Sequence, residues 1–341
     1  MRCIGSVNLC IRKKKFIMKS KQRIIWIDIA KAIAIIMMII GHEVAFGGKV
    51  RNLIFSFHMP LFFILTGYTM KPVDNVYQLA KQIKKDIARI IVPCVVVQVL
   101  NWIIFFFLYG GEPVEIIKNL LQQLIWASAV NVGEHPALGA LWFLVVLFWS
   151  KIGLSIIDLI FPQKNKLIIC LFLSLGSVLI SSYSWLPQSL DVTLMAILFL
   201  YMGRIIKEYY AFLLKYANAI VSIAFLVWML CWQNGLYIEM GARSYPVYPL
   251  CIIEAIGGCM CVIYLSMNLE ITHVSKILAP IGKISLIILC VHHLDGYFSG
   301  LWNTYGVLEK CIIQVGFDVM VAFFISILKT GLKKYALRKN H

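Results

Sequence analysis

The sequence predicts an all-α, polytopic membrane protein with about ten transmembrane helices and both termini in the cytoplasm. Its 341 residues are 61% hydrophobic and only 14% charged, with a mean hydropathy of +0.84. That is more apolar surface than the core of a soluble domain of this length can hold. Apolar runs of about 20 residues, the length needed to cross a bilayer, recur along the whole chain. Basic residues are concentrated in every second connection between these runs.

Ten apolar runs mark the expected membrane spans and leave no gap large enough for a separate soluble domain. They are 24–41, 52–70, 91–109, 140–157, 167–184, 192–206, 218–236, 247–267, 283–301 and 309–328. The sixth run is short, so we expect a tilted, shortened or incomplete span there. The chain therefore divides into a basic tail, residues 1–23, a transmembrane domain, 24–328, and a second basic tail, 329–341.

The connections between the spans differ sharply in charge. Only five Lys and Arg lie on one side, namely Lys49, Arg51, Lys118, Arg243 and Lys310, whereas the two tails and the alternate connections carry most of the others. By the positive-inside rule, both tails are cytoplasmic. This segregation explains the net charge of +16 without a nucleic-acid partner. We expect a multi-pass protein of a bacterial cytoplasmic membrane, in contact with membrane lipids.

The connection 71–90 has apolar residues at helical spacing, opposed by basic ones. This pattern predicts a cytoplasmic amphipathic helix that lies on the membrane surface. Its Lys85 and Arg89 suit two roles, anchoring to lipid headgroups or binding a ligand. The sequence does not decide between them.

Three ionisable residues, Asp28, Lys31 and His42, lie on the first span. At 100° per residue they share one helix face, and about 16 Å separates Lys31, toward the cytoplasm, from His42 near the outer end. Exposure of such groups to lipid costs several kcal/mol, so they normally face a cavity or a bundle interior. The stripe predicts a cavity with a cationic floor. The alternative is an interfacial Asp28–Lys31 ion pair that only anchors the helix.

The second span contains "SFHMPLFF", with His58 at a depth comparable to that of His42. Pro60 cannot donate a backbone hydrogen bond, which leaves the carbonyl near Ser56 without its usual donor. Such irregularity is tolerated in membranes where protein or a cavity satisfies the freed groups. His58 is either a cavity residue or a packing histidine bonded to a backbone carbonyl.

Four segments occur in the order expected of a known family: "WIDIAKAIAIIMMIIGH", "FSFHMPLFFILTGY", "GALWFLVVLFW" and "PIGKISLIILCVHHL". Together they resemble the acyltransferase 3 family of ten-helix membrane O-acyltransferases over residues 21–330, most closely the fucose 4-O-acetylase-like branch. The resemblance implies acyl transfer from a cytoplasmic donor, typically acetyl-CoA, to a hydroxyl of a glycan or lipid-linked sugar. His42 matches the family's catalytic histidine and Asp28 its acidic residue. Lys31 stands where most members have arginine, which keeps the charge but loses the bidentate fork.

Transfer to an alcohol needs a base, because a hydroxyl is a poor nucleophile until its proton is removed. His42 is the candidate base, and Glu43 or Glu134 would orient its ring unless both are solvated loop carboxylates. His58 is one candidate donor to the thioester oxyanion. In a competing mechanism, His42 itself carries the acetyl group. Lys31, with Lys85 and Arg89, would hold the coenzyme phosphates.

The remaining candidates lie near the outer side. Trp142 is either an aromatic-belt residue or part of the acceptor site. His292 and His293 point about 100° apart on a helix, so we expect at most one of them, His292, to face the cavity. No spacing typical of metal ligands is present, and we expect no metal. The main rival function is a secondary transporter or exporter, since intramembrane His, Lys and Asp also mark substrate paths.

Overall fold

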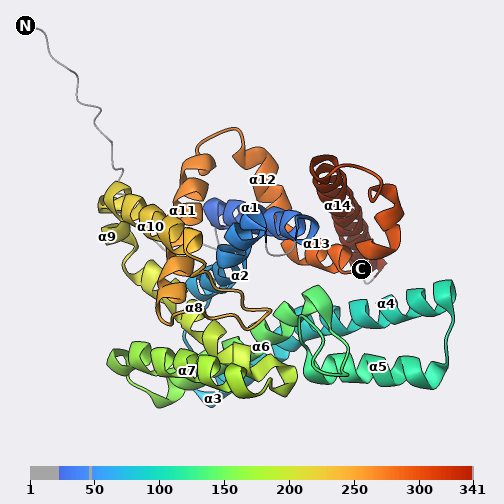
Figure 1. Cartoon of the computed structure of the whole chain (residues 1–341), viewed down its shortest axis with the longest axis horizontal. Helices are drawn as coiled ribbons and strands as arrows, with labels where there is room; N and C mark the ends of the chain where they lie inside the picture. Colours follow the sequence, from blue (N-terminus) through green and yellow to red (C-terminus); the bar gives the residue numbers. More distant parts are fainter. Residues whose placement is uncertain (1–22, 46–47, 340–341) are drawn as a thin grey trace, which may run out of the picture.

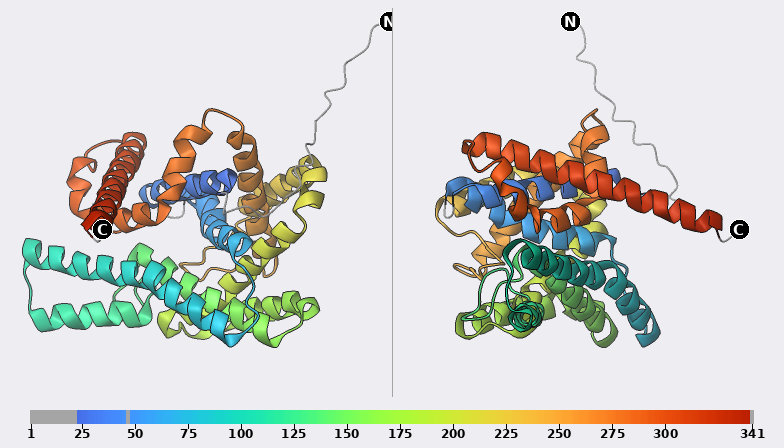
Figure 2. Two further views of the ribbon diagram at one scale, coloured as in Figure 1. Left: turned by 180° about the vertical axis from the view of Figure 1, so that it is seen from behind. Right: turned by 90° about the vertical axis from the view of Figure 1, so that its right-hand side faces the viewer.

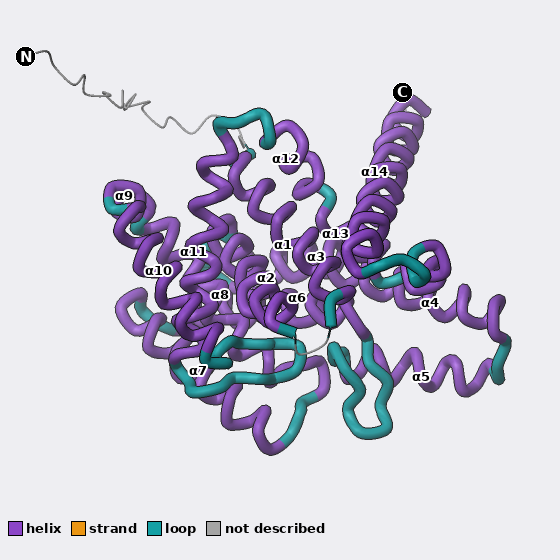
Figure 3. The backbone as a smooth tube through the Cα atoms, turned by 45° about the horizontal axis from the view of Figure 1, so that its top comes forward, coloured by secondary structure: helices purple, strands orange, loops and turns teal. Residues whose placement is uncertain are grey.

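The computed structural model describes residues 23–45 and 48–339, and these residues form helices and connections without a β-strand (Figure 1, Figure 3). Within these described residues, eight helices are long and apolar enough to cross a membrane. They are α1 Ile25–Glu43, α2 Lys49–Thr69, α3 Val76–Asp86 running on into α4 Val92–Tyr109, α6 Trp142–Ile160, α7 Gln163–Tyr183, α8 Leu190–Glu208, α11 Leu250–Glu270 and α14 Val307–Lys339. The protein is therefore a multi-pass membrane protein. Of the predicted tail 1–23, only Arg23 falls within the described residues.

Three further segments determine whether the count reaches ten. The helix α10, Ala217–Gln233, is apolar but shorter than the other spans. The helices α12, Ser275–Lys283, and α13, Ser285–His292, are bent by 66° and make a ninth span if they cross together. The predicted continuous span 283–301 is thus wrong, because the chain kinks at Ile284 and continues past α13 as a 3-10 helix, Asp295–Leu301. The predicted number of ten spans stays a prediction.

The expected surface helix at 71–90 is not a separate element. α3 passes through a π-helical turn, Ile87–Ile91, directly into α4, so that 34 residues from Val76 to Tyr109 form one helix. The sequence pattern is amphipathic in its first part and apolar in its second. The π-helical turn lies just before Pro93, which has no backbone N–H, and the helix continues through this irregularity, so a single helix carries both patterns.

Three other differences concern an additional helix and the lengths of two predicted ones. The connection after α4 contains α5, Pro113–Trp126, which turns back beside α4 and forms the projecting hairpin of Figure 1. The sixth span, expected to be short or incomplete, is the regular 19-residue helix α8. α14 continues to Lys339 and therefore includes most of the predicted basic tail 329–341.

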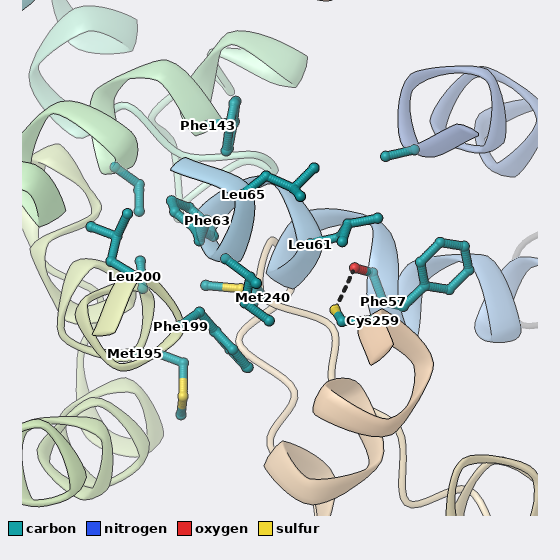
Figure 4. Packing of buried hydrophobic residues seen from close by; sticks show 14 of the residues in the cluster. Phe57, Leu61, Phe63, Leu65, Phe143, Met195, Phe199, Leu200, Met240 and Cys259 are labelled. Atoms are coloured by element: carbon teal, nitrogen blue, oxygen red, sulfur yellow. Dashed lines mark hydrogen bonds between the residues drawn. The ribbon is translucent and has the colours of Figure 1, made fainter. Parts of the chain in front are cut away.

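α2 and α8 approach each other at backbone distance. A Cβ added at Gly67 would overlap the carbonyl oxygen of Leu200, and one at Gly203 would overlap that of Ile64. Small residues allow this close packing, which drives helix association in lipid, where hydrophobic burial gives no advantage. Figure 4 shows side chains of the two helices interleaved around this contact.

α1 lies deep inside the assembly although it is the first helix of the chain. It packs against α2, α11 and α12 and touches α13 and α14, as the views of Figures 1 and 2 agree. Its contact with α12 is again glycine-dependent, because a Cβ at Gly282 would overlap the carbonyl oxygen of Asp28. The face of α1 that carries the predicted polar stripe therefore lies among these helices, with Lys31 half-buried and the side chain of His42 exposed.

Candidate active site

A cavity of about 710 Å³ lies between α1, α2, α6 and α13. Two connections complete its wall, 127–138 and 234–249, which touch each other where Gly241 meets Ala129. Its polar lining residues are Lys31, His42, Glu43, Arg51, His58, Thr66, Trp142, Glu239, Ser285, His292, His293, Asp295 and Gln314. The volume lies within the range of about 300–1,000 Å³ that is usual for ligand sites.

The polar groups of the cavity separate into two ends. At one end are Lys31 from α1, Thr66 from α2 and Ser285 from α13, which we call the Lys31 end. At the other end the same three helices present a histidine each, and we call this the histidine end. On α1 the two ends are about 16 Å apart along the helix axis. The predicted stripe from Lys31 to His42 therefore lines one cavity.

His42 occupies the last turn of α1. Its ring centroid lies 5.4 Å from that of Phe55 and 5.3 Å from that of His292. Asp28 does not share this environment, because its buried carboxylate accepts hydrogen bonds from Nε and Nη2 of Arg23, at 2.6 and 3.0 Å. Of the three residues in the predicted stripe, Lys31 and His42 line the cavity, whereas Asp28 pairs with Arg23, which precedes the helix.

His292 has the most complete set of partners. Its Nδ1 lies 2.9 Å from Oδ2 of Asp295 and 3.1 Å from Oδ2 of Asp318, and both carboxylates are buried. Gln314 donates a further hydrogen bond of 2.6 Å to Asp295. Sequence reasoning did not assign Asp318, although a lone carboxylate inside the apolar run 309–328 is itself a signal of function.

The adjacent residues His292 and His293 differ from the expectation that at most one of them faces the cavity. His293 keeps helical backbone angles at the end of α13, and the cavity is nevertheless lined by both His292 and His293. His293 Nε2 donates to Oε1 of Gln98 at 2.8 Å, and Gln98 in turn bonds to Gln123. The expectation that only one of the two histidines faces the cavity is therefore wrong.

His58 lines the cavity and also makes the hydrogen bond expected of a packing histidine. Its Nδ1 lies 2.9 Å from the carbonyl oxygen of Ile54, and the ring is buried. A carbonyl oxygen only accepts, so Nδ1 carries the proton, and the neutral ring has an acceptor at Nε2. This geometry favours a role in accepting a hydrogen bond rather than donating to an oxyanion. Ser56 is turned elsewhere, toward Leu53 and Trp228.

An ion pair that sequence reasoning did not predict crosses the histidine end. Arg51 donates to both carboxylate oxygens of Glu239, at 3.2 and 2.8 Å, and its guanidinium lies 3.9 Å above the ring of Phe55. Glu239 belongs to the connection 234–249, which inserts among the helices. Burial there raises the pKa of the Tyr245 phenol well above its usual range. The ion pair could not be predicted, because carboxylates such as that of Glu239 are common in connections and nothing in the sequence indicates that it contacts Arg51.

The other predicted site residues divide between the cavity and the surface. Trp142 begins α6 and lines the cavity. Glu43 lines it too, but its carboxylate pairs with Nζ of Lys310 at 2.7 Å. Glu134 is exposed in a turn, and Lys85 and Arg89 are exposed on the long helix, so these three do not line the cavity.

His292, Asp295 and Asp318 form the one group of the described residues that has the composition of a metal site. Their candidate ligand atoms lie within 4.8 Å of one another. The same atoms already satisfy one another as a histidine hydrogen-bonded by two carboxylates. We therefore interpret the group as a hydrogen-bonded cluster, which we call the His292 cluster.

The comparisons with known proteins identify the family and go no further. No curated protein and no solved structure matches the chain. The model of the acyltransferase 3 family, described as an acyltransferase domain, matches residues 24–330, which is most of the chain and includes the whole cavity. The chain therefore belongs to the acyltransferase 3 family and is a membrane acyltransferase.

Proposed function

We propose that the protein is an O-acetyltransferase that transfers an acetyl group from acetyl-CoA to a hydroxyl of a glycan or lipid-linked sugar. The observation that carries this proposal is a single cavity that joins a half-buried lysine, Lys31, to a set of histidines. An acyl-CoA has anionic phosphates at one end and a thioester at the other. The cavity has a cation, Lys31, at one end, where the phosphates would lie, and a base, His42, at the other end, where the thioester would lie.

The Lys31 end suits the donor. Lys31 supplies a positive charge for a coenzyme phosphate, as a point charge rather than as the fork that arginine provides. α13 begins at Ser285 at this same end, and the N-terminus of a helix adds a partial positive charge. Lys85 and Arg89 are exposed outside the cavity, where we propose that they contact parts of the coenzyme that protrude from it.

The histidine end suits the chemistry. His42 accepts the proton of the acceptor hydroxyl while the hydroxyl oxygen attacks the thioester carbonyl. Proton transfer of this kind contributes about 10²- to 10⁴-fold to rate. The indole N–H of Trp142, which can only donate, is a candidate partner for the oxyanion that develops on the carbonyl oxygen. Glu239 and His58 offer acceptors for the other hydroxyls of a sugar.

The experiment uses the purified protein in lipid vesicles, with radiolabelled acetyl-CoA and a panel of glycan acceptors. His42→Ala is expected to lower kcat about 10²- to 10⁴-fold. His273→Ala is the matched control, because this histidine is exposed in the connection before α12. Equal activity of wild type and His42→Ala would contradict the role of His42. Proton-coupled glycan flux without acetylation would instead support the transporter alternative.

The same assay separates a base from a nucleophile. If His42 carries the acetyl group, wild type incubated with labelled acetyl-CoA and no acceptor accumulates labelled protein that loses its label when the acceptor is added. If His42 acts only as a base, label reaches the acceptor without appearing on the protein. We expect the second result, because a base that removes the hydroxyl proton lets the acceptor attack the thioester directly, without a covalent intermediate on the protein.

A further inference from the structure

The cavity contains two adjacent histidines with different surroundings. The rings of His42 and His292 are 5.3 Å apart between centroids and tilted by 40°. His292 has two buried carboxylates at Nδ1, whereas the described ring neighbours of His42 are Phe55 and His292. A base needs a free lone pair, and a proton donor needs a proton. The two surroundings match these two requirements.

We propose that His292 is a second catalytic residue, the proton donor to the departing coenzyme thiolate, and that Asp295 and Asp318 are the positioning residues that hold it. This inference rests on the proposed acetyl-CoA donor. It goes beyond the proposed function because it assigns the leaving-group step to a residue other than His42.

The geometry of the His292 cluster supports this division. Asp295 comes from the 3-10 helix and Asp318 from α14, so the ring is held from two directions. Nδ1 is occupied by these contacts, which leaves Nε2 as the nitrogen that can serve the cavity. Two carboxylates, only 7% and 0% exposed, lie at one nitrogen, and this arrangement favours the protonated ring over the neutral one.

The step balances with the groups that the cavity provides. The acceptor oxygen forms a C–O bond to the acetyl carbon, and the C–S bond of the thioester breaks. His42 takes the hydroxyl proton, and His292 gives a proton to the thiolate sulfur, so the products are an acetyl ester and a free thiol. The proton on His42 then passes to His292, directly or through water between the two rings. Both histidines return to their starting states.

The test varies the leaving group. A thiolate from an acidic aryl thiol departs without protonation, whereas an alkyl thiolate such as that of coenzyme A benefits from it. We compare acetyl-CoA with the S-acetyl ester of 4-nitrothiophenol in wild type, His292→Ala and His42→Ala. His292→Ala is expected to lose about 10²- to 10⁴-fold in kcat with acetyl-CoA and less than about tenfold with the aryl thioester. His42→Ala is expected to lose similar factors with both donors.

Asp318→Asn tests the positioning role without removing the ring. It is expected to lower kcat with acetyl-CoA, to leave the acetyl-CoA KM nearly unchanged, and to shift the ratio of the two donors in the same direction as His292→Ala. Glu254→Gln is the matched control, since Glu254 is a fully buried carboxyl on α11 that does not line the cavity. It should leave the donor ratio at the wild-type value.

Three outcomes overturn the inference. One is an equal loss with both donors in His292→Ala, and another is an unchanged donor ratio in Asp318→Asn. The third is a stoichiometric metal in the purified protein together with loss of activity in chelator, which would make the cluster a metal site. A wild type that acetylates no acceptor would refute the proposed function instead. If His292→Ala fails to fold, as judged by its melting temperature, Asp318→Asn decides the question.

Discussion

The two ends of the cavity are built in different ways. At the Lys31 end the helices meet backbone to backbone, through Gly67 and Gly203 between α2 and α8 and through Gly282 against α1. At the histidine end, buried ion pairs hold the parts together, among them Arg51–Glu239. Glycine contacts themselves add no charge, so they bring the helices together without placing a further ion pair beside Lys31. Ion pairs fix the orientation of side chains, which catalysis requires.

The largest expected loss of stability comes from removing one partner of the buried ion pair at the histidine end. Arg51→Ala leaves Glu239 buried and unpaired, and we expect about 3–5 kcal/mol of lost stability. The exposed fraction of both side chains is small, 9% and 12%. Thermal unfolding in detergent measures the effect. The double variant Arg51→Leu with Glu239→Leu should recover much of the loss, and no recovery would show that the pair contributes through something other than unpaired charge.

Adding a methyl group at a glycine contact tests the Lys31 end. Gly203→Ala forces α8 away from the carbonyl oxygen of Ile64, and we expect about 1–3 kcal/mol of destabilisation from overpacking. Gly176→Ala in α7 is the control, because its Cβ would only touch Leu194 at ordinary contact distance. Equal melting temperatures of the two variants would contradict the close approach of α2 and α8.

Lys31 should affect the donor and not the acceptor. Lys31→Ala is expected to raise the acetyl-CoA KM about tenfold, which corresponds to about 1.4 kcal/mol of binding. Lys31→Arg should retain the charge and most of the affinity. Steady-state kinetics with each substrate varied in turn measures both constants. A change confined to the acceptor KM would place the coenzyme elsewhere.

The smallest expected effect concerns the exposed basic residues. Lys85→Glu and Arg89→Glu should each raise the acetyl-CoA KM only about twofold, and the effect should vanish as salt screens exposed charges at about 1 M. Repeating the Lys31 measurement across the same salt series sharpens the contrast, because buried groups are screened much less. An effect equal to that of Lys31→Ala would extend the coenzyme site to this surface.

Much of the fold is predictable because a membrane span can be recognised in the sequence from the length and composition of its apolar run. The predicted runs 24–41, 140–157 and 247–267 lie within a few residues of α1, α6 and α11. The 66° bend between α12 and α13 was not predicted, although it falls at Ile284, just after Pro280 and Gly282 and at the start of the run 283–301. The close packing of α12 against α1 at Gly282 is a tertiary contact that the sequence does not reveal.

The site was predictable where one helix supplies the residues. Helical phase alone places Lys31 and His42 on one face, and the structure puts both in the same cavity. Partnerships across helices escape such reasoning. The contact of His292 with Asp318 joins α13 to α14, and no sequence period connects two helices. Glu43, expected to orient His42, instead pairs with Lys310, which lies on another helix, α14, so this contact could not be predicted either.

The central place of α1 has a consequence for how the protein is made. The neighbours that enclose its polar face include α11, α12, α13 and α14, which the ribosome synthesises last. Until those helices enter the membrane, Lys31 and His42 have only α2 from this set beside them. Until translation ends, α1 therefore holds Lys31 and His42 in the membrane without all of its final neighbours, which is energetically unfavourable for ionisable side chains. A nascent chain that stalls before α12 therefore lacks three of the helices that pack against α1, namely α12, α13 and α14.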